Sequence, residues 1–370
     1  TKVNLKNIQM IMQNIYFFIG TKAQAIKCIP LINFLSGKQK LKLQIVNSGQ
    51  HAKITEGIFE NLNSNVSHIN LYSKQENISK YLKGLYWMLS FVFKNLILQT
   101  LNKSKDNKGD ICVVHGDTIS TILGLLWAKR NKFKVLHLES GLTSNSIFNP
   151  FPEEIIRKIT SRFSDILICF DDDSYKRLVD SYSSKYIFKV TENTVMETLG
   201  IRFEEVNKSN IVTATLHRTE NILSKKRLQM FLDLLTKLTD SFEVNWYLHE
   251  PTINAIKKHK IQIPPSINLY DLIKHKDFIF KLKKSKIVVT DGGSIQEECF
   301  YLGNTTVIWR KKTERPYAMN KNMFISNFDI NKSFDFIMDN SDKKYIPKSL
   351  DTSPSIEIYN FLKENNLIEI

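Results

Sequence analysis

Residues 111–142, ICVVHGDTISTILGLLWAKRNKFKVLHLESGL, decide the fold of this 370-residue chain. An apolar, β-branched run at 111–115 is followed by a polar turn, a helical stretch and a second such run at 134–138. A strand, a helix and a strand in this order form a βαβ unit with parallel strands. Both runs end in a polar cluster, which predicts that the two clusters lie at the carboxyl edge of one sheet.

The same alternation extends in both directions from this unit. Further candidate strands of the first half cover residues 14–19, 42–47, 166–170 and 187–190. After a polar stretch at 203–209 the pattern restarts, with candidate strands at 210–215, 243–248, 267–270, 286–290 and 305–309. The sequence therefore predicts an α/β protein with two Rossmann-like domains, whose parallel sheets face each other across a deep cleft.

The length of the chain also favours two domains, because a single core rarely grows to this size. We expect an N-terminal domain over residues 1–205 and a second domain over 206–350. The end of the chain, 351–370, has apolar residues at helical spacing, which predicts a last helix that packs back toward the N-terminal domain. These residues are Ile356, Ile358, Phe361, Leu362 and Leu367.

The composition is that of a soluble globular protein, with 42% hydrophobic and 24% charged residues. The net charge of +15 comes from lysines scattered along the whole sequence. Since no nucleic-acid-binding motif accompanies them, we expect a pocket for a polyanion and no nucleic-acid partner. The most apolar stretch, residues 82–99, contains Lys83 and Lys94, which favours a core helix over a membrane span.

The four cysteines are far apart and have no CxxC pairs or histidine-rich neighbours. This spacing predicts neither a metal site nor a disulfide framework. We expect buried thiols in a reducing compartment, which is a cytoplasmic location.

Three acidic residues of the first half are candidates for proton transfer. Asp117 and Glu139 follow consecutive strands, and Glu153 comes a few residues later. Carboxylates gathered in a partly desolvated pocket have pKa values that move apart, which provides an acid and a base. The alternative is that each acidic residue caps the helix that follows it. The turn at Gly20, between a strand and a helix, is a weaker candidate that offers free N–H groups to a phosphate.

The second half contains residues suited to a diphosphate and a ribose. His217 and Arg218 follow the first strand of this half, and both are hydrogen-bond donors to an anion. Gly292 and Gly293 open a helix after another strand, so the backbone can approach phosphates, and Glu298 lies one turn further on, where its carboxylate can accept from two ribose hydroxyls.

Taken together, these stretches resemble the UDP-N-acetylglucosamine 2-epimerase family of the non-hydrolysing type, which has the two-domain GT-B fold. The resemblance runs from about Tyr16 to the last helix. It includes, in the family's order, VHGDT, HLESGL, PFPEEIIR, TENTV, TLHRTEN, DGGSIQEE and TERP.

The resemblance implies roles for residues at matching positions. It makes Asp117, Glu139 and Glu153 the catalytic carboxylates and places His217 beside the diphosphate. It also implies that the residues in contact with the UDP part are Arg157, Gly292, Gly293, Ser294, Glu298 and Arg315. Lys22 stands where the family has arginine and Gln24 where it has glutamate, and Gly292 and Ser294 exchange the usual DSGG order. His51 lies in a segment that family members can use for a second, regulatory substrate molecule.

The implied reaction interconverts UDP-N-acetylglucosamine and UDP-N-acetylmannosamine, or a modified UDP-2-acetamido sugar, for the synthesis of surface-polysaccharide precursors. It proceeds through a 2-acetamidoglucal and bound UDP, and the implied enzyme is a homodimer without metal or other cofactor. Three alternatives stay open. They are a hydrolysing epimerase that releases N-acetylmannosamine and UDP, a GT-B glycosyltransferase, and a binding module that has lost a catalytic carboxylate.

Overall fold

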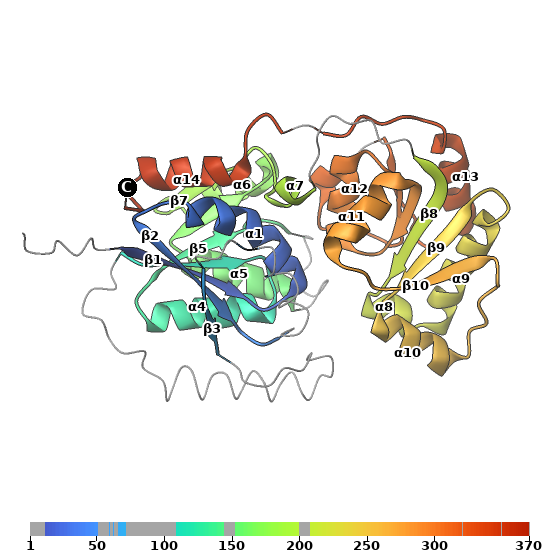
Figure 1. Cartoon of the computed structure of the whole chain (residues 1–370), viewed down its shortest axis with the longest axis horizontal. Coiled ribbons are helices and arrows are strands. Elements are labelled where there is room, and N and C mark those ends of the chain that lie inside the picture. Colours follow the sequence, from blue (N-terminus) through green and yellow to red (C-terminus); the bar gives the residue numbers. More distant parts are fainter. Residues whose placement is uncertain are drawn as a thin grey trace, which may run out of the picture. The chain divides into compact units, whose positions relative to one another are not determined.

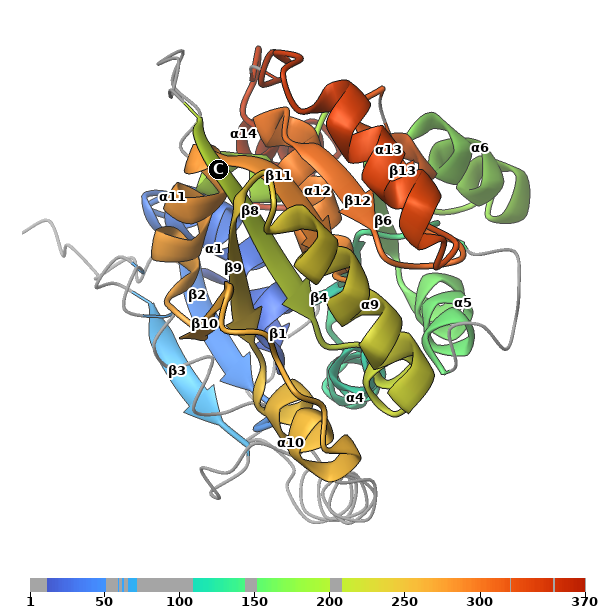
Figure 2. The ribbon, with the colours of Figure 1, turned by 90° about the vertical axis from the view of Figure 1, so that its right-hand side faces the viewer.

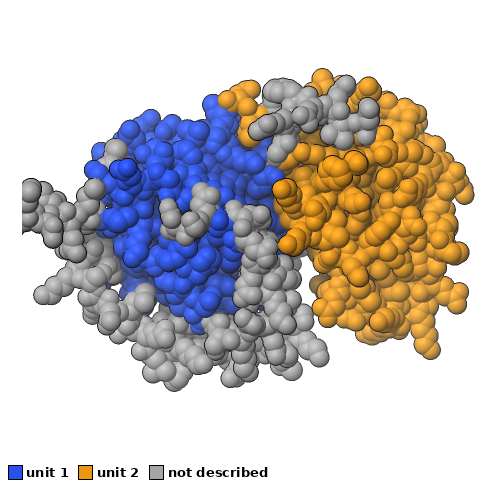
Figure 3. Space-filling view, viewed as in Figure 1, with its two compact units in different colours: residues 1–198, 352–370 blue, residues 199–351 orange. Residues whose placement is uncertain are grey.

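The computed structural model describes residues 12–50, 59, 62, 66–71, 109–143, 152–199, 208–319, 321–348 and 350–369. The chain divides into two compact units, which Figure 3 colours separately. Unit 1 consists of residues 1–198 and 352–370, and unit 2 of residues 199–351. The helix expected over residues 82–99 and the candidate residue His51 lie outside the described residues.

The described part of unit 1 contains a seven-stranded sheet in which all neighbouring strands are parallel. The strand order is β3-β2-β1-β4-β5-β6-β7. The strands are β1 Gln13–Ile19, β2 Leu41–Asn47, β3 Ser67–Asn70, β4 Ile111–His115, β5 Lys134–Leu138, β6 Ile166–Cys169 and β7 Tyr186–Lys189. All five residues of β4 are buried, as expected for a central strand covered on both faces.

Helices cover this sheet on its two faces (Figure 1). They are α1 Lys22–Ser36, α4 Ile119–Arg130, α5 Glu153–Phe163, α6 Asp172–Ser181, α7 Val195–Thr198 and α14 Pro354–Glu364. One core cluster joins α1 and α14 to β1 and β2 and includes the buried side chains of Ile32 and Ile358. The helix near the end of the chain, α14, thus packs on the N-terminal sheet, where Phe361 stacks on Phe188 at 4.6 Å.

The described part of unit 2 contains a six-stranded, all-parallel sheet of order β10-β9-β8-β11-β12-β13. Its strands are β8 Ser209–Leu216, β9 Glu243–Leu248, β10 Ile267–Asp271, β11 Ser285–Thr290, β12 Thr305–Ile308 and β13 Met323–Ile325. Its helices are α8 Thr219–Ile222, α9 Lys225–Leu238, α10 Glu250–His259, α11 His275–Lys284, α12 Gly293–Leu302, the 3-10 turn η2 Pro316–Ala318 and α13 Ile330–Asn340. Figure 2 shows α9 and α13 in front of these strands, and the core beneath them includes Phe231, Trp246 and Trp309.

The predicted α/β class and the two parallel sheets are confirmed, and each strand that was predicted is present within one residue of its expected ends. Two strands were not predicted, β3 and β13. Both lie at sheet edges, and they are only four and three residues long. Three or four residues are too few to show the alternation or the longer apolar run by which a strand is recognised in a sequence. Within the described residues, no helix is long and apolar enough to cross a membrane.

Candidate functional site

In each unit several candidate residues follow the two neighbouring strands at which the strand order reverses. In unit 1, β1 and β4 are neighbours, and the chain continues from them toward opposite edges of the sheet. In unit 2 the corresponding pair is β8 and β11. The loops after such strands diverge and leave room for a ligand at the carboxyl edge. Both units therefore place their polar clusters where open α/β sheets bind ligands.

The turn after β1 is closed by the side chain of Gln24. Thr21 caps α1, and the Oε1 of Gln24 accepts hydrogen bonds from the backbone N–H groups of Gly20 at 3.0 Å and Thr21 at 3.2 Å. Nε2 of Gln24 donates to the carbonyl of His115 at 2.8 Å. The expectation that this turn offers free N–H groups is therefore wrong for Gly20 and Thr21, because Gln24 uses both to join β1 to β4. Lys22 is the first residue of α1 and is partly buried.

The turn after β4 is held by a buried histidine. Gly116 has a φ of +66°, a conformation that favours glycine. Its N–H donates to Leu138 at 2.9 Å, and its carbonyl lies 2.8 Å from Nε2 of His137. Burial lowers the pKa of His137 to about 4, so the ring is neutral and Nε2 carries the proton toward this carbonyl. These bonds fix the backbone that carries Asp117.

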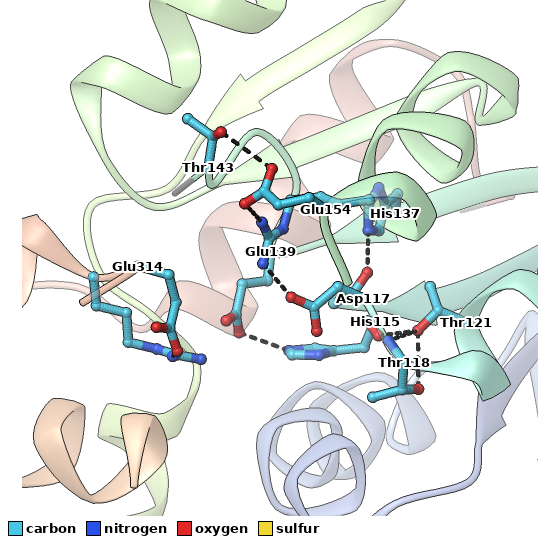
Figure 4. Close-up of polar contacts among 12 residues, drawn as sticks. His115, Asp117, Thr118, Thr121, His137, Glu139, Thr143, Glu154 and Glu314 are labelled. Atoms are coloured by element: carbon cyan, nitrogen blue, oxygen red, sulfur yellow. Dashed lines mark hydrogen bonds and ion pairs between the residues drawn. The ribbon is translucent and has the colours of Figure 1, made fainter. Parts of the chain in front are cut away.

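Asp117 is joined to α5 through Arg157. The two form an ion pair in which Arg157 is 3% exposed and Asp117 is 28% exposed. Nη1 of Arg157 also donates to Glu154 at 2.5 Å, and Glu154 accepts from Thr143 at 3.1 Å (Figure 4). Thus Arg157, which the sequence assigned to the UDP part, has its guanidinium between Asp117 and Glu154. Glu153, the first residue of α5, is next to Glu154 in the chain and partly buried.

Glu139 lies at the end of β5 and is also paired. Its backbone has a φ of +59°, which is uncommon for a residue with a side chain, and it is 4% exposed. Lys27 from α1 places Nζ 2.5 Å from Oε2 of Glu139, and Nε2 of His115 lies 3.3 Å from the same oxygen. Figure 4 shows His115 and Glu139 facing each other near Asp117. The sequence reasoning missed Lys27, although a lysine within the apolar run at 25–29 was a signal.

In unit 2, the buried carboxylate of Asp291 organises the loop after β8. It accepts from the backbone N–H groups of His217 at 3.1 Å and Arg218 at 2.9 Å and from the amide of Asn221 at 2.9 Å. Nδ1 of His217 lies 3.1 Å from Oδ1 of Asp291. Burial by itself raises the pKa of Asp291, but these contacts outweigh it and lower the pKa to about 2. Asp291 is therefore ionised and holds His217 at the carboxyl edge.

A second buried carboxylate, Glu314, accepts hydrogen bonds from three arginines at this edge. Arg218 and Arg315 donate to its Oε1 at 3.1 and 2.6 Å, and Arg310 donates to its Oε2 at 2.6 Å. Burial opposes ionisation, but the three guanidinium groups hold the pKa of Glu314 well below its usual range. Glu314 thus fixes Arg315 beside the start of α12.

The start of α12 allows a close approach of its backbone. Gly292 is the N-cap and Gly293 the first helical residue. A Cβ on Gly293 would lie 2.3 Å from Nη1 of Arg315, so any other residue here would displace that guanidinium. Ser294, the next residue, is partly buried. A helix N-terminus with an adjacent guanidinium is suited to binding a phosphate group.

Glu298 lies further along α12, and its side chain is 4% exposed. It accepts a hydrogen bond from His275, the first residue of α11, which no sequence pattern had singled out. Within the described residues, no group of three or more His, Cys, Asp or Glu side chains is placed to hold a metal ion. The four cysteines are free and buried.

Comparisons with known proteins identify the family and support the fold. The sequence profile of a protein family described as UDP-N-acetylglucosamine 2-epimerase matches residues 34–333. The UDP-N-acetylglucosamine 2-epimerase of Campylobacter jejuni is 27% identical over 335 residues, covering 83% of this chain and 84% of that protein. The crystal structure of Methanocaldococcus jannaschii UDP-GlcNAc 2-epimerase in complex with UDP-GlcNAc and UDP has a TM-score of 0.77 at 23% identity, covering 95% of this chain and 100% of the other. The Neisseria meningitidis enzyme bound to UDP-GlcNAc has a TM-score of 0.65 at 23% identity, covering 96% and 100%.

Proposed function

Because this chain belongs to the UDP-N-acetylglucosamine 2-epimerase family, we propose that it interconverts UDP-N-acetylglucosamine and UDP-N-acetylmannosamine and returns UDP to the sugar in each turnover. The same mechanism applies to a modified UDP-2-acetamido sugar. The proposed setting is a cytoplasmic homodimer that supplies precursors for surface polysaccharides, and the free, buried thiols suit a reducing compartment.

The reaction couples two bond cleavages. The hydrogen at C2 is not acidic enough to be removed from the intact sugar. If a carboxylate takes this proton while the C1–O bond to UDP breaks, the electron pair of the C–H bond forms the C1=C2 double bond of a 2-acetamidoglucal. Delivery of a proton to the opposite face of C2 and addition of UDP to C1 complete the inversion. Each proton transfer contributes about 10²- to 10⁴-fold in rate.

The observation that carries this proposal is the pair of carboxylates at the ends of β4 and β5. Asp117 is held by Arg157, and Glu139 is held by Lys27 and faces His115. A cationic partner favours the ionised form of a carboxylate, which is the form that can accept a proton. We assign the acid and base roles to Asp117, Glu139 and Glu153 together, with Arg157 holding Asp117 in place.

Unit 2 supplies the contacts to UDP in this proposal. The turn formed by Gly292, Gly293 and Ser294 offers backbone N–H groups to the diphosphate, and Arg315 and His217 lie beside it. Donors at this position stabilise the negative charge that develops on the departing diphosphate. Glu298 accepts from the ribose hydroxyls. Lys22 and His51 stay candidates for further contacts to substrate.

The test is turnover of UDP-N-acetylglucosamine in deuterated water, followed by NMR spectroscopy. UDP-N-acetylmannosamine should accumulate with deuterium at C2, and the Glu139→Gln protein should be slower by about two orders of magnitude or more. Inversion without deuterium at C2 would rule out the elimination. Free UDP and N-acetylmannosamine that accumulate in step with conversion would instead identify a hydrolysing enzyme. Activity confined to another UDP-2-acetamido sugar would correct the substrate.

A further inference from the structure

A partly buried hydrogen bond in unit 2 has no role in the reaction described above. Nε2 of His275 lies 2.8 Å from Oε1 of Glu298, and the two side chains are 16% and 4% exposed. His275 is the first residue of α11, which precedes β11, and Glu298 is in α12, which follows it. The bond therefore joins the two helices that flank this strand in the chain.

The hydrogen bond with His275 uses only one of the two carboxylate oxygens of Glu298. We take Nε2 of His275 as the donor and the carboxylate oxygen of Glu298 as the acceptor. Among the described residues, Oε2 of Glu298 has no hydrogen-bond partner. A glutamate side chain has several rotatable bonds, and ordering it on binding lowers affinity. His275 restricts this motion before a ligand arrives.

The neighbouring residue on α12 shows that this orientation is specific. Consecutive helical residues point about 100° apart. Glu297 is fully buried, and its Oε2 lies 3.6 Å from Nε of Arg315. Glu298 faces α11 instead. It is five residues beyond Gly293, about 7.5 Å along the helix axis. The proposed function places the phosphates of UDP at the start of α12 and its ribose at Glu298.

We propose that His275 is a positioning residue that aims the carboxylate of Glu298 at the two ribose hydroxyls of a uridine diphosphate. This inference rests on the proposed function, in which Glu298 holds the ribose. The alternative is that the hydrogen bond only fastens α11 to α12. The two roles differ in one respect, because only a positioning role depends on the hydroxyls of the ligand.

The experiment compares the binding of UDP and 2′,3′-dideoxy-UDP to the full-length protein by calorimetry. His275→Ala should weaken UDP binding about 3- to 10-fold and change dideoxy-UDP binding by less than about twofold, because the latter has no hydroxyls to hold. His275→Gln keeps a donor and should restore most of the affinity. In turnover, His275→Ala should raise KM and leave kcat nearly unchanged.

His259→Ala is the matched control, since this histidine ends α10 in the same unit and forms no hydrogen bond through Nε2 with the described residues. It should leave UDP binding unchanged. Equal losses for both ligands in His275→Ala, or no loss for UDP, would overturn the inference and leave the proposed function standing. Failure of the unaltered protein to bind UDP would overturn the proposed function itself, and the inference with it.

Discussion

Lys27 and Glu139 form an ion pair inside unit 1, and their side chains are only 2% and 5% exposed. Removing one partner of a buried pair leaves an uncompensated charge, which destabilises a protein by about 3–5 kcal/mol. An exposed pair contributes only about 0–1 kcal/mol, because water screens it. Unit 1 contains such a pair as well, Lys129 and Asp165, which are 2.8 Å apart and both 41% exposed.

These two pairs give a prediction at the residue scale. Lys27→Met should lower the free energy of unfolding by about 3 kcal/mol or more, because it removes the lysine partner of a buried carboxylate. Lys129→Met should lower it by about 1 kcal/mol or less. Urea denaturation of the two variants beside the unaltered protein measures both values. Similar small losses in both would show that the buried pair does not stabilise unit 1.

At the scale of a single element, the start of α12 depends on the absence of a side chain. A Cβ on Gly293 would displace the end of Arg315, which lies in the way at 2.3 Å. The end of a long side chain can move. A Cβ on Gly293 should therefore shift the guanidinium of Arg315 and change the stability of the protein little. Gly37, the C-cap of α1, is different, since the nearest atom to its Cβ would be a carbonyl oxygen at 3.7 Å.

Gly293→Ala should therefore weaken UDP binding about tenfold or more, since a hydrogen bond to a charged group contributes about 1.5–3 kcal/mol. The melting temperature should change little. Gly37→Ala introduces the same methyl group at an ordinary van der Waals distance from its nearest neighbour and should change neither quantity. Calorimetric titration with UDP and a thermal melt of each variant check this expectation. An unchanged UDP affinity in Gly293→Ala would remove Arg315 and this helix start from the proposed site.

At the scale of the whole molecule, buried titratable groups determine how stability depends on pH. The pKa of His137 falls from 6.5 to about 4 on folding because the ring is buried. The unfolded chain therefore binds a proton in a range of pH where the folded chain does not. This group makes the protein less stable as the pH falls from about 6.5 to about 4. Protonation of Asp291 affects stability only at lower pH, because its pKa is lowered from 3.8 to about 2.

Between pH 7 and pH 5, His137 should account for a loss of about 2 kcal/mol in the free energy of unfolding. His137→Gln retains a donor for the Gly116 carbonyl but has no group that titrates in this range. Urea denaturation at pH 7 and pH 5 should show a smaller difference between the two pH values for this variant than for the unaltered protein. If the two proteins lose the same amount, protonation of His137 does not contribute to their acid sensitivity.

The strands and the polar clusters that follow them were predictable because both are local patterns. An apolar, β-branched run identifies a buried parallel strand, and a polar cluster directly after it must lie at the carboxyl edge of the sheet. For this reason Asp117, Glu139, His217 and Gly292 were found from the sequence alone. The edge strands β3 and β13 were missed because they are only four and three residues long, which is too short for an alternating or apolar pattern to stand out from the surrounding sequence.

The sequence by itself therefore determined the α/β class, the two parallel sheets and the residues at their carboxyl edges. Only the tertiary structure decided which of these residues pair. Glu139 meets Lys27 across 112 residues of chain, and Asp117 meets Arg157 across 40. His275 meets Glu298 across 23 residues. The hydrophobic pattern of the sequence cannot predict such contacts, because they depend on how separate helices pack on a sheet. That packing is determined by the complementary surfaces of whole elements.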